Sequence, residues 1–282
     1  MRAALLYTII SAENKLLLEA AKARGLELER LADAELQLEL TEPQTEFDGI
    51  LQRSSSYART LYTSFWFEQA GAYVCNPYAA HHLCGDKYLA STLLAKAGIP
   101  TPRTYGSFTP ESATKSASAL AFPLVMKPVF GSWARMVHKI NDREALEAEL
   151  ENREEMGHAF QKVYYLQEHI DKPGRDIRAF VVGNECIGAI YRNATEKSGW
   201  ITNTGRGGTA TNCPVTEELN ELAVRAAHVF GEGIYGVDMM ESGNGLVVHE
   251  VNHTTEFRNS IAPTGVDIPG IMIEYFVSRL KR

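Results

Sequence analysis

The chain has 282 residues, of which 45% are hydrophobic and 22% are charged, and its formal net charge at pH 7 is −7. This composition is typical of a folded globular protein and excludes disordered and collagen-like chains. No apolar run approaches the ~20 residues that span a bilayer, and the acidic charge argues against a nucleic-acid partner.

The N-terminus and the cysteines indicate a cytoplasmic protein. A polar segment starts at Ser11, directly after MRAALLYTII, where a secretory signal would continue its apolar stretch. The four cysteines form no CxxC pair, so we expect reduced thiols. His81, His82 and Cys84 lie close together, but no second cluster completes a zinc site. We expect these three side chains to have structural roles.

The first ninety residues alternate short apolar runs with helical segments, a pattern typical of a small open α/β sheet. Ser11 predicts the N-cap of a helix over 12–24 that ends at Gly25. Strands are expected at 3–7, 27–31, 49–53 and 73–76, and a second helix at 57–69. No residue in this region gives a catalytic signal.

A boundary follows the helix expected at 87–97, because Gly98, Pro100 and Pro102 interrupt the chain there. Later strands are expected at 122–127, 136–140, 164–170, 177–182, 186–192, 235–240 and 246–252, and helices at 142–156, 216–230 and from 268 to the C-terminus. The predicted fold class is therefore α/β (α+β), divided into residues 1–88, a small central unit of 89–163 and a C-terminal unit of 164–282.

The last two strands predict a metal site. Glu250 and Asn252 lie two residues apart and so share one face of a strand. A hairpin centred on Asn244 would place Asp238 directly opposite Glu250. Two carboxylates and an amide oxygen suit Mg²⁺. The alternative is the polar face of an edge hairpin, but grouped acids among apolar neighbours would repel one another without a cation.

Two lysines stand in contexts that suit phosphate. Lys127 ends an apolar strand just before the loop at Gly131, and Lys87 opens a helix. A glycine loop lets backbone N–H groups approach phosphate oxygens, while a lysine supplies a mobile charge. Together with the Mg²⁺ hairpin they indicate a nucleoside triphosphate, although the chain has no Walker motif.

Arginines add positive charge to this acidic chain. Asp176 and Arg178 share a face of one strand, and Arg192 and Asn193 close the next, ahead of a glycine-rich loop at 202–208. Such arginines clamp carboxylate or phosphate oxygens bidentately. Surface ion pairing is the alternative, and it applies more to Arg175 than to Arg178, which enters an apolar strand.

The ordered motifs resemble the ATP-grasp superfamily, glutamate-ligase-like branch. They are Asp86-Lys87, Val125-Met126-Lys127-Pro128, Gly131-Ser132-Trp133, Gln167-Glu168-His169-Ile170, Gly174-Arg175-Asp176-Ile177-Arg178, Asp238 and Glu250-Val251-Asn252. The stretch from Glu250 to Ser260 is most similar to the α-aminoadipate ligases of the amino-group-carrier route to lysine. Ala134, Asn193 and His249 depart from the family pattern.

The resemblance implies an ATP-grasp fold, in which two α+β subdomains clasp ATP behind a small open α/β domain, and it implies roles for the matched residues. ATP would be bound by Lys87, Lys127, Gly131, Ser132, Trp133, Gln167, Glu168, His169, Ile170, Asp176, Arg178 and Asn203. One or two Mg²⁺ ions would be held by Asp238, Glu250 and Asn252. Catalysis would use Arg192, Asn203 and Arg206. The amino acid would meet Arg178, Arg192, Asn193, Thr204, Glu256, Phe257, Arg258, Asn259, Ser260, Thr264 and Gly265.

The reaction implied by the resemblance joins the amino group of L-2-aminoadipate to the C-terminal glutamate side chain of a small acidic carrier protein, with ATP converted to ADP. Asn259-Ser260 stands where the glutamate-using sibling enzyme has Gly-Phe. Family members form homo-oligomers, so a dimer or tetramer is expected. The alternatives are the same reaction with glutamate, glutamate addition to glutamate or to a protein tail, and an ATP-binding regulator without catalysis. We expect Asp238→Ala or Glu250→Ala to abolish activity and leave the fold intact.

Overall fold

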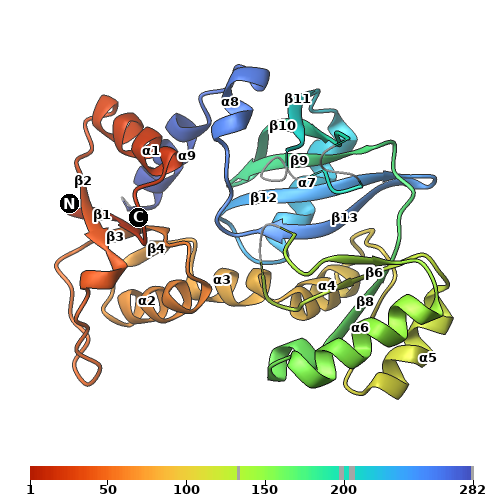
Figure 1. Cartoon of the computed structure of the whole chain (residues 1–282). Coiled ribbons are helices and arrows are strands. Elements are labelled where there is room, and N and C mark those ends of the chain that lie inside the picture. The colour runs from red at the N-terminus through yellow and green to blue at the C-terminus, as the bar shows by residue number, and fades with distance from the viewer. Residues whose placement is uncertain (132–133, 197–199, 203–206, 281–282) are drawn as a thin grey trace.

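The computed structural model describes residues 1–131, 134–196, 200–202 and 207–280, and it contains three β-sheets with helices packed against them (Figure 1). The mixed α/β class is as predicted. No helix within these ranges combines the length and the apolar character needed to cross a membrane.

The N-terminal sheet is parallel and has the strand order β2-β1-β3-β4. Its strands are β1 (Ala3–Tyr7), β2 (Leu28–Ala32), β3 (Gly49–Arg53) and β4 (Tyr73–Cys75), and its first helices are α1 (Ala12–Ala23) and α2 (Tyr57–Gln69). As predicted, Ser11 caps α1, because its side chain accepts a hydrogen bond from the Asn14 backbone N–H. Short 3₁₀ helices occupy Asp33–Glu35 and Ala159–Lys162.

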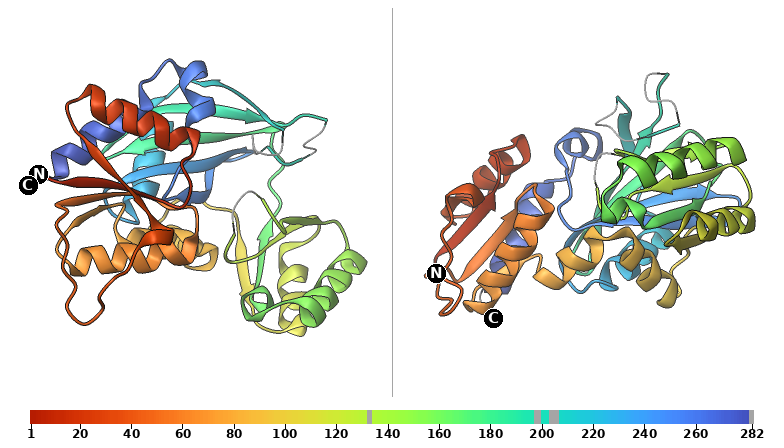
Figure 2. Two further views of the ribbon diagram at one scale, coloured as in Figure 1. Left: turned by 60° about the vertical axis from the view of Figure 1, so that its left-hand side comes forward. Right: turned by 60° about the horizontal axis from the view of Figure 1, so that its bottom comes forward.

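The last helix, α9 (Ile268–Leu280), returns to the N-terminal sheet and packs beside α1. Its residues Ile268, Met272 and Phe276 are at most 2% exposed and share one apolar core with Leu5 and Leu17. The two ends of the chain consequently lie close together (Figure 2).

The small sheet is antiparallel, in the order β5-β8-β6-β7. It consists of β5 (Thr104–Ser107), β6 (Leu124–Lys127), β7 (His138–Ile140) and β8 (Tyr164–Glu168), covered by α5 (Pro110–Leu120) and α6 (Arg143–Met156). The sequence did not predict β5 and α5. β5 is short, and α5 is rich in Ala, Ser and Thr and buries only Ala113 and Ala117, so its apolar periodicity is weak.

The large sheet is antiparallel, in the order β11-β10-β9-β12-β13. Its strands are β9 (Arg175–Val182), β10 (Glu185–Asn193), β11 (Thr209–Cys213), β12 (Ile234–Ser242) and β13 (Gly245–Asn252). One face is covered by α3 (Tyr78–Gly85), α4 (Lys87–Lys96) and α7 (Glu217–His228), and α8 (Arg258–Thr264) contacts β10 and β11. The capping threonine of α7, Thr216, is as predicted. The sequence did not predict α3, β11 or α8.

The sheets cross the boundaries expected from the sequence. Tyr164–Glu168, assigned above to the C-terminal unit, is β8 and pairs with β5 and β6. Helix α4 packs into the core of the large sheet through Ala90 and Leu94. The division into three units therefore stays a proposal, in which β8 belongs to the small unit and α4 to the large one.

Candidate active site

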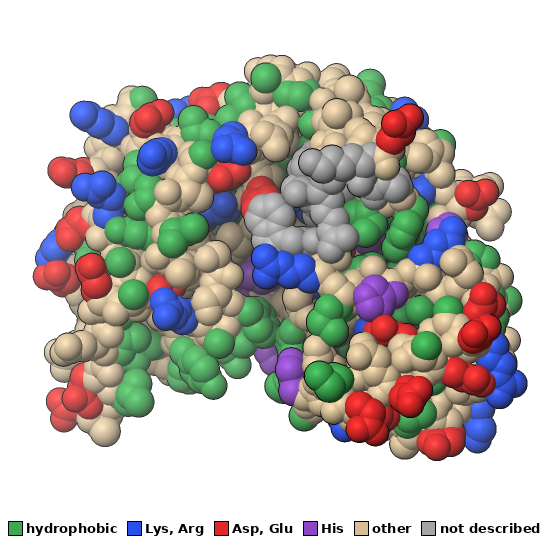
Figure 3. Space-filling model, viewed as in Figure 1, with side chains coloured by type: hydrophobic (Ala, Val, Ile, Leu, Met, Phe, Trp, Pro, Cys, Tyr) green, Lys and Arg blue, Asp and Glu red, His purple; other side chains and the backbone are tan. Residues whose placement is uncertain are grey.

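All three sheets contribute to a cavity of about 760 Å³. Figure 3 shows a hollow near the centre of the view, with acidic and basic side chains at its edge. The cavity lies against β12 and β13 of the large sheet, the last residues of β6 and β8 of the small sheet, and the ends of β1 and β3. Its walls therefore come from segments that are far apart in the sequence.

Most of the predicted site residues line this cavity. They are Lys87, Lys127, Gly131, Gln167, Glu168, His169, Ile170, Asp176, Arg178, Arg192, Asp238, Glu250, Asn252, Glu256, Phe257, Arg258, Asn259 and Ser260. The predicted residues Ser132, Trp133, Asn203, Thr204 and Arg206 lie outside the described part of the chain.

Three predicted residues do not line the cavity. The Asn193 side-chain amide donates to Thr211 Oγ1 at 3.1 Å, on the neighbouring strand β11. Thr264 Oγ1 donates to the backbone carbonyl of Ser260 at 2.7 Å, and Gly265 ends α8 in the left-handed conformation with φ 68°. These two residues shape the end of α8, because their hydrogen bonds lie within that helix and the turn directly after it.

The hairpin of β12 and β13 brings the predicted metal ligands together. Asp238 pairs directly with Glu250, as predicted. The cause is a bulge, because Met239 pairs with Val248, so His249 is an extra residue in β13. Without that extra residue the same turn would place position 249 opposite Asp238. His249 lines the cavity, and its burial lowers its pKa to about 4.

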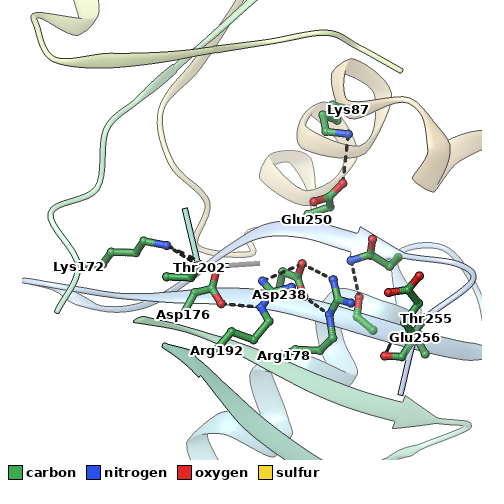
Figure 4. A network of polar contacts seen from close by, with 12 residues as sticks. Lys87, Lys172, Asp176, Arg178, Arg192, Thr202, Asp238, Glu250, Thr255 and Glu256 are labelled. Atoms are coloured by element: carbon green, nitrogen blue, oxygen red, sulfur yellow. Dashed lines mark hydrogen bonds and ion pairs between the residues drawn. The ribbon is translucent and has the colours of Figure 1, made fainter. Parts of the chain in front are cut away.

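Arginines balance the charge of Asp238. Arg178 donates to both carboxylate oxygens at 2.7 Å, and Arg192 Nη2 lies 3.1 Å from Oδ2 (Figure 4). Burial alone would raise the pKa of Asp238, but the two guanidinium groups hold it well below its usual range. The sequence argument that grouped acids require a cation was therefore incomplete, since arginines from β9 and β10 reach the same carboxylate.

The charges form an alternating row across the sheet. Arg192 pairs with Asp176 in the β9–β10 register, and its Nε donates to Asp176 Oδ1 at 2.6 Å. Lys172 Nζ lies 3.5 Å from Asp176 Oδ2, and Thr202 donates to the same oxygen. Lys172, Asp176, Arg192, Asp238 and Arg178 thus alternate in sign, as Figure 4 shows. The row places one more cation than anions against the cavity.

The two predicted phosphate lysines face this row from the opposite wall. Lys87 Nζ lies 3.1 Å from Glu250 Oε1 and donates to the Gly131 carbonyl at 2.8 Å. Lys127 Nζ donates to Gln167 Oε1 at 2.7 Å, and burial lowers the pKa of Lys127 to about 8. Lys87 is the first residue of α4, whose N-cap is Asp86. Both amines can therefore reach an anion held between the sheets.

The donor set near the hairpin suits a hard cation. Two carboxylates and one amide lie on adjacent strands, and the Asn252 amide nitrogen donates to the Gly236 carbonyl at 3.3 Å. Within the described ranges no group of three or more His, Cys, Asp or Glu side chains could hold a metal ion. A cation at this site would consequently depend on the amide oxygen and on oxygens of a bound ligand as well as on Asp238 and Glu250.

The sequence analysis missed the part of the cavity wall formed by the N-terminal sheet. Ser11, Glu13 and Arg53 line the cavity, although no catalytic signal was expected there. They follow or end β1 and β3, and ligands of open α/β sheets bind at the carboxyl ends of such strands. That rule, applied to the predicted strands at 3–7 and 49–53, was the available signal.

Comparisons with known proteins agree with this geometry. The RimK-like ATP-grasp domain family matches residues 84–276, and the LysX preATP-grasp domain family matches residues 3–83. The alpha-aminoadipate–LysW ligase LysX of Saccharolobus solfataricus is 33% identical over 96% of this chain and 98% of its own. The glutamate–LysW ligase ArgX of Sulfurisphaera tokodaii is 33% identical over 98% of both chains.

Solved structures show the same fold. A RimK-domain ATP-grasp protein from Sphaerobacter thermophilus superposes with a TM-score of 0.84 at 27% identity, over 98% of this chain and 100% of that one. D-alanine–D-alanine ligase from Bacillus anthracis, solved with ATP, has a TM-score of 0.75 at 16% identity, over 100% of this chain and 98% of that one, which shows the fold alone. The resemblance and the fold expected from the sequence are confirmed: this chain belongs to the RimK-like ATP-grasp family, carries a LysX-type preATP-grasp domain, and is an amide-bond-forming ligase.

Proposed function

We propose that this ligase joins the α-amino group of L-2-aminoadipate to the γ-carboxylate of the C-terminal glutamate of a small acidic carrier protein, with ATP converted to ADP and phosphate. One observation carries the proposal. One wall of the cavity carries two lysines, and the opposite wall carries the Asp238–Glu250 pair beside two arginines. The relatives named as LysW ligases indicate the kind of carrier.

The chemistry requires this distribution of charge. A carboxylate repels an attacking amine and has no adequate leaving group, so it must first be converted to an acyl phosphate. Phosphoryl transfer depends on positioning and on neutralised charge more than on covalent catalysis. Lys87 and Lys127 are suited to phosphate oxygens, and backbone groups of Glu168, His169 and Ile170, at the end of β8, to adenine.

Asp238, Glu250 and Asn252 would hold one or two Mg²⁺ ions, which supply positive charge against the phosphates when bound. Arg192 lies next to Asp238 and is suited to the negative charge of the acyl phosphate and the tetrahedral intermediate. Asn203 and Arg206, outside the described residues, are proposed to assist it. Arg178 and the Arg258–Ser260 segment are proposed to receive the carboxylates of the amino acid.

Aminoadipate is preferred to glutamate on the basis of Asn259 and Ser260, which both line the cavity. The similarity alone does not decide between them, because the LysX of Saccharolobus solfataricus and the ArgX of Sulfurisphaera tokodaii are both 33% identical to this chain. Thr204, Asn193, Thr264 and Gly265 stay predictions for this subsite. A cytoplasmic homo-oligomer, a dimer or tetramer, is part of the proposal and rests on the family resemblance.

The test is an amine-selectivity assay. The purified chain is supplied with a LysW-type carrier, ATP and Mg²⁺, and with L-2-aminoadipate or L-glutamate, and ADP release and the mass of the carrier are measured. We expect the carrier to gain one aminoadipate residue, and aminoadipate to be used faster than glutamate. ATP binding without ADP release for either amino acid would overturn the proposal, and faster use of glutamate would overturn the choice of amine.

The metal-site variant for this assay is Glu250→Gln. Asp238→Ala is unsuitable, because it leaves Arg178 without its carboxylate, removes one of the two carboxylates that Arg192 contacts, and costs about 3–5 kcal/mol. The expectation from the sequence that both alanine variants leave the fold intact therefore changes for Asp238. Glu250, with a 29% exposed side chain, tolerates the amide, so we expect at least ~100-fold loss of turnover in a folded protein. Glu147→Gln, on the exposed face of α6, is the control and should keep wild-type turnover.

A further inference from the structure

Arg53 is a cavity-lining arginine that makes no salt bridge with any described residue. It ends β3 and lines the cavity, and its Nη2 donates to the Thr255 backbone carbonyl at 3.1 Å. Its Nε is buried and has no hydrogen-bond partner among the residues that the structure describes. Arg178 and Arg192 line the same cavity, with side chains 14% and 5% exposed, and both are paired with carboxylates. The guanidinium group of Arg53 therefore has N–H donors available for a ligand.

The electrostatic surroundings of Arg53 call for an anion. Burial lowers the pKa of Arg53, and the more distant carboxylates of Glu13 and Glu256 only partly offset this effect. A buried cation without a contacting counter-ion costs free energy, which an arriving carboxylate would recover. The guanidinium is also held in place, since it lies 6.0 Å from the centre of the Phe257 ring. The site is thus preorganised for a planar anion.

The position of Arg53 in the fold is a ligand-binding position. The order β2-β1-β3-β4 reverses direction between β1 and β3, because α1 leads from β1 to β2 on one side and β3 lies on the other. Ligands of open parallel sheets bind at the carboxyl ends of the strands at such a switch point. Arg53 ends β3 there, and Ser11 begins α1 there.

The two carboxylates of the amino acid differ in their distance from the reacting amine, and this difference decides which of them Arg53 can bind. The α-carboxylate of an amino acid shares a carbon with the amine, so it stays on the large sheet beside Arg178, which pairs with Asp238. The side-chain carboxylate of aminoadipate lies roughly 5 Å further along the substrate. Glu256 lines the same cavity, and the positive charges of Arg178 and Arg53 both oppose the rise that burial causes in its pKa. An extended substrate thus runs from the large sheet toward the N-terminal sheet.

We propose that Arg53 binds the side-chain carboxylate of the amino-acid substrate and so selects an acidic side chain. This role rests on the proposed function and makes the N-terminal sheet part of the amine site. Asn259 and Ser260 then adjust the length of side chain that is accepted, while Arg53 sets its charge.

The experiment compares Arg53→Met with the wild type, using L-2-aminoadipate and L-norleucine, which has a methyl group in place of the side-chain carboxylate. We expect the kcat/KM for aminoadipate to fall about 10- to 100-fold, mainly through KM, because one charge-assisted interaction is lost. The KM values for ATP and carrier should stay within twofold, and the preference for aminoadipate over norleucine should shrink by the same factor. The kcat/KM of Arg53→Lys for aminoadipate should be intermediate, because lysine keeps the positive charge but cannot donate two parallel hydrogen bonds to a carboxylate.

Two controls separate binding from folding. Arg30→Met removes an exposed arginine from β2, outside the cavity, and should leave all the constants unchanged. Thermal unfolding of Arg53→Met without substrates should occur at or above the wild-type temperature, because the variant lacks an uncompensated buried charge. The stabilisation that aminoadipate gives to the wild type should be weaker in the variant.

The results that would overturn the role of Arg53 differ from the result that would overturn the proposed function. An unchanged KM for aminoadipate would overturn the role of Arg53, as would a raised KM for the carrier alone, which would assign Arg53 to the carrier's terminal carboxylate. Equal losses for aminoadipate and norleucine would show a general structural effect and also overturn it. Absence of wild-type turnover with any acidic amino acid would overturn the proposed function, and the role of Arg53 with it.

Discussion

Lys127 is a cavity side chain whose charge changes within the working pH range of an enzyme. Its pKa is about 8, because burial outweighs the attraction of Glu250, and its amino group is held by Gln167 at 2.7 Å. Below that pH the side chain is a cation facing the alternating row of Asp and Arg side chains. Above it the amine is neutral and keeps only hydrogen bonds. The pH dependence of the affinity of the free protein for a polyphosphate should therefore follow the charge of Lys127.

We predict that the dissociation constant for MgATP rises about tenfold between pH 7 and pH 9, because the charged fraction of Lys127 falls from roughly nine-tenths to one-tenth. The sign follows from the lowered pKa: the binding-competent cation is present below pH 8 and lost above it. Calorimetric titration at each pH measures the constant. Lys127→Arg keeps its charge, so its constant should be flat over this range, and a parallel rise in both proteins would contradict the assignment.

At the scale of elements, the hairpin of β12 and β13 depends on two local irregularities. The extra residue His249 shifts the register so that Glu250 faces Asp238. Gly236 in β12 gives room to the segment after β13, because a Cβ there would lie 2.4 Å from Thr255 Oγ1 and 2.9 Å from Thr255 Cβ. Thr255 is 1% exposed, and its carbonyl holds Arg53. The close approach at Gly236 thus positions Thr255 and the part of the cavity that is proposed to bind the amino acid.

We predict that Gly236→Ala lowers the free energy of unfolding by about 1–3 kcal/mol, because Thr255 has to move and takes its backbone with it. The KM for the amino acid should rise while the KM for ATP changes less. Gly243→Ala, in the turn of the same hairpin, is the matched control, since nothing lies within 4 Å of its added Cβ. Urea denaturation measures both, and equal stability of the two variants would refute the steric role of Gly236.

At the scale of the whole molecule, the sheet that forms the N-terminal wall of the cavity is packed against the last helix of the chain. The N-terminal sheet buries one face under α1 and α9, and α9 comes from the last residues of the chain. Leu280 packs against Gly49 so closely that a Cβ there would lie 2.1 Å from its side chain. The sheet that carries Arg53 is therefore completed by the opposite end of the sequence.

We predict that a chain ending at Val266 is insoluble or unfolded, because it leaves the apolar face around Leu5 and Leu17 uncovered. A second variant, Ile273→Asp, keeps the full length and places a charge in the same core, where the isoleucine is 0% exposed. It should lose at least ~3 kcal/mol of stability. Chemical denaturation followed by circular dichroism measures this, and a native-like transition for either protein would contradict the packing role of α9.

The sequence by itself determined most of the local elements, since apolar periodicity and caps such as Ser11 and Thr216 are local signals, although it did not show β5, α5, α3, β11 or α8. It also pointed to the Asp238–Glu250 pairing by counting from a turn centred on Asn244, whereas the observed pairing depends on the extra residue His249 in β13. Only the tertiary structure decided that arginines from β9 and β10 neutralise Asp238, and that Arg53 reaches the cavity from β3. The reason is physical: these residues meet through sheet order and packing between segments far apart in the chain, and no local pattern encodes a contact of that kind.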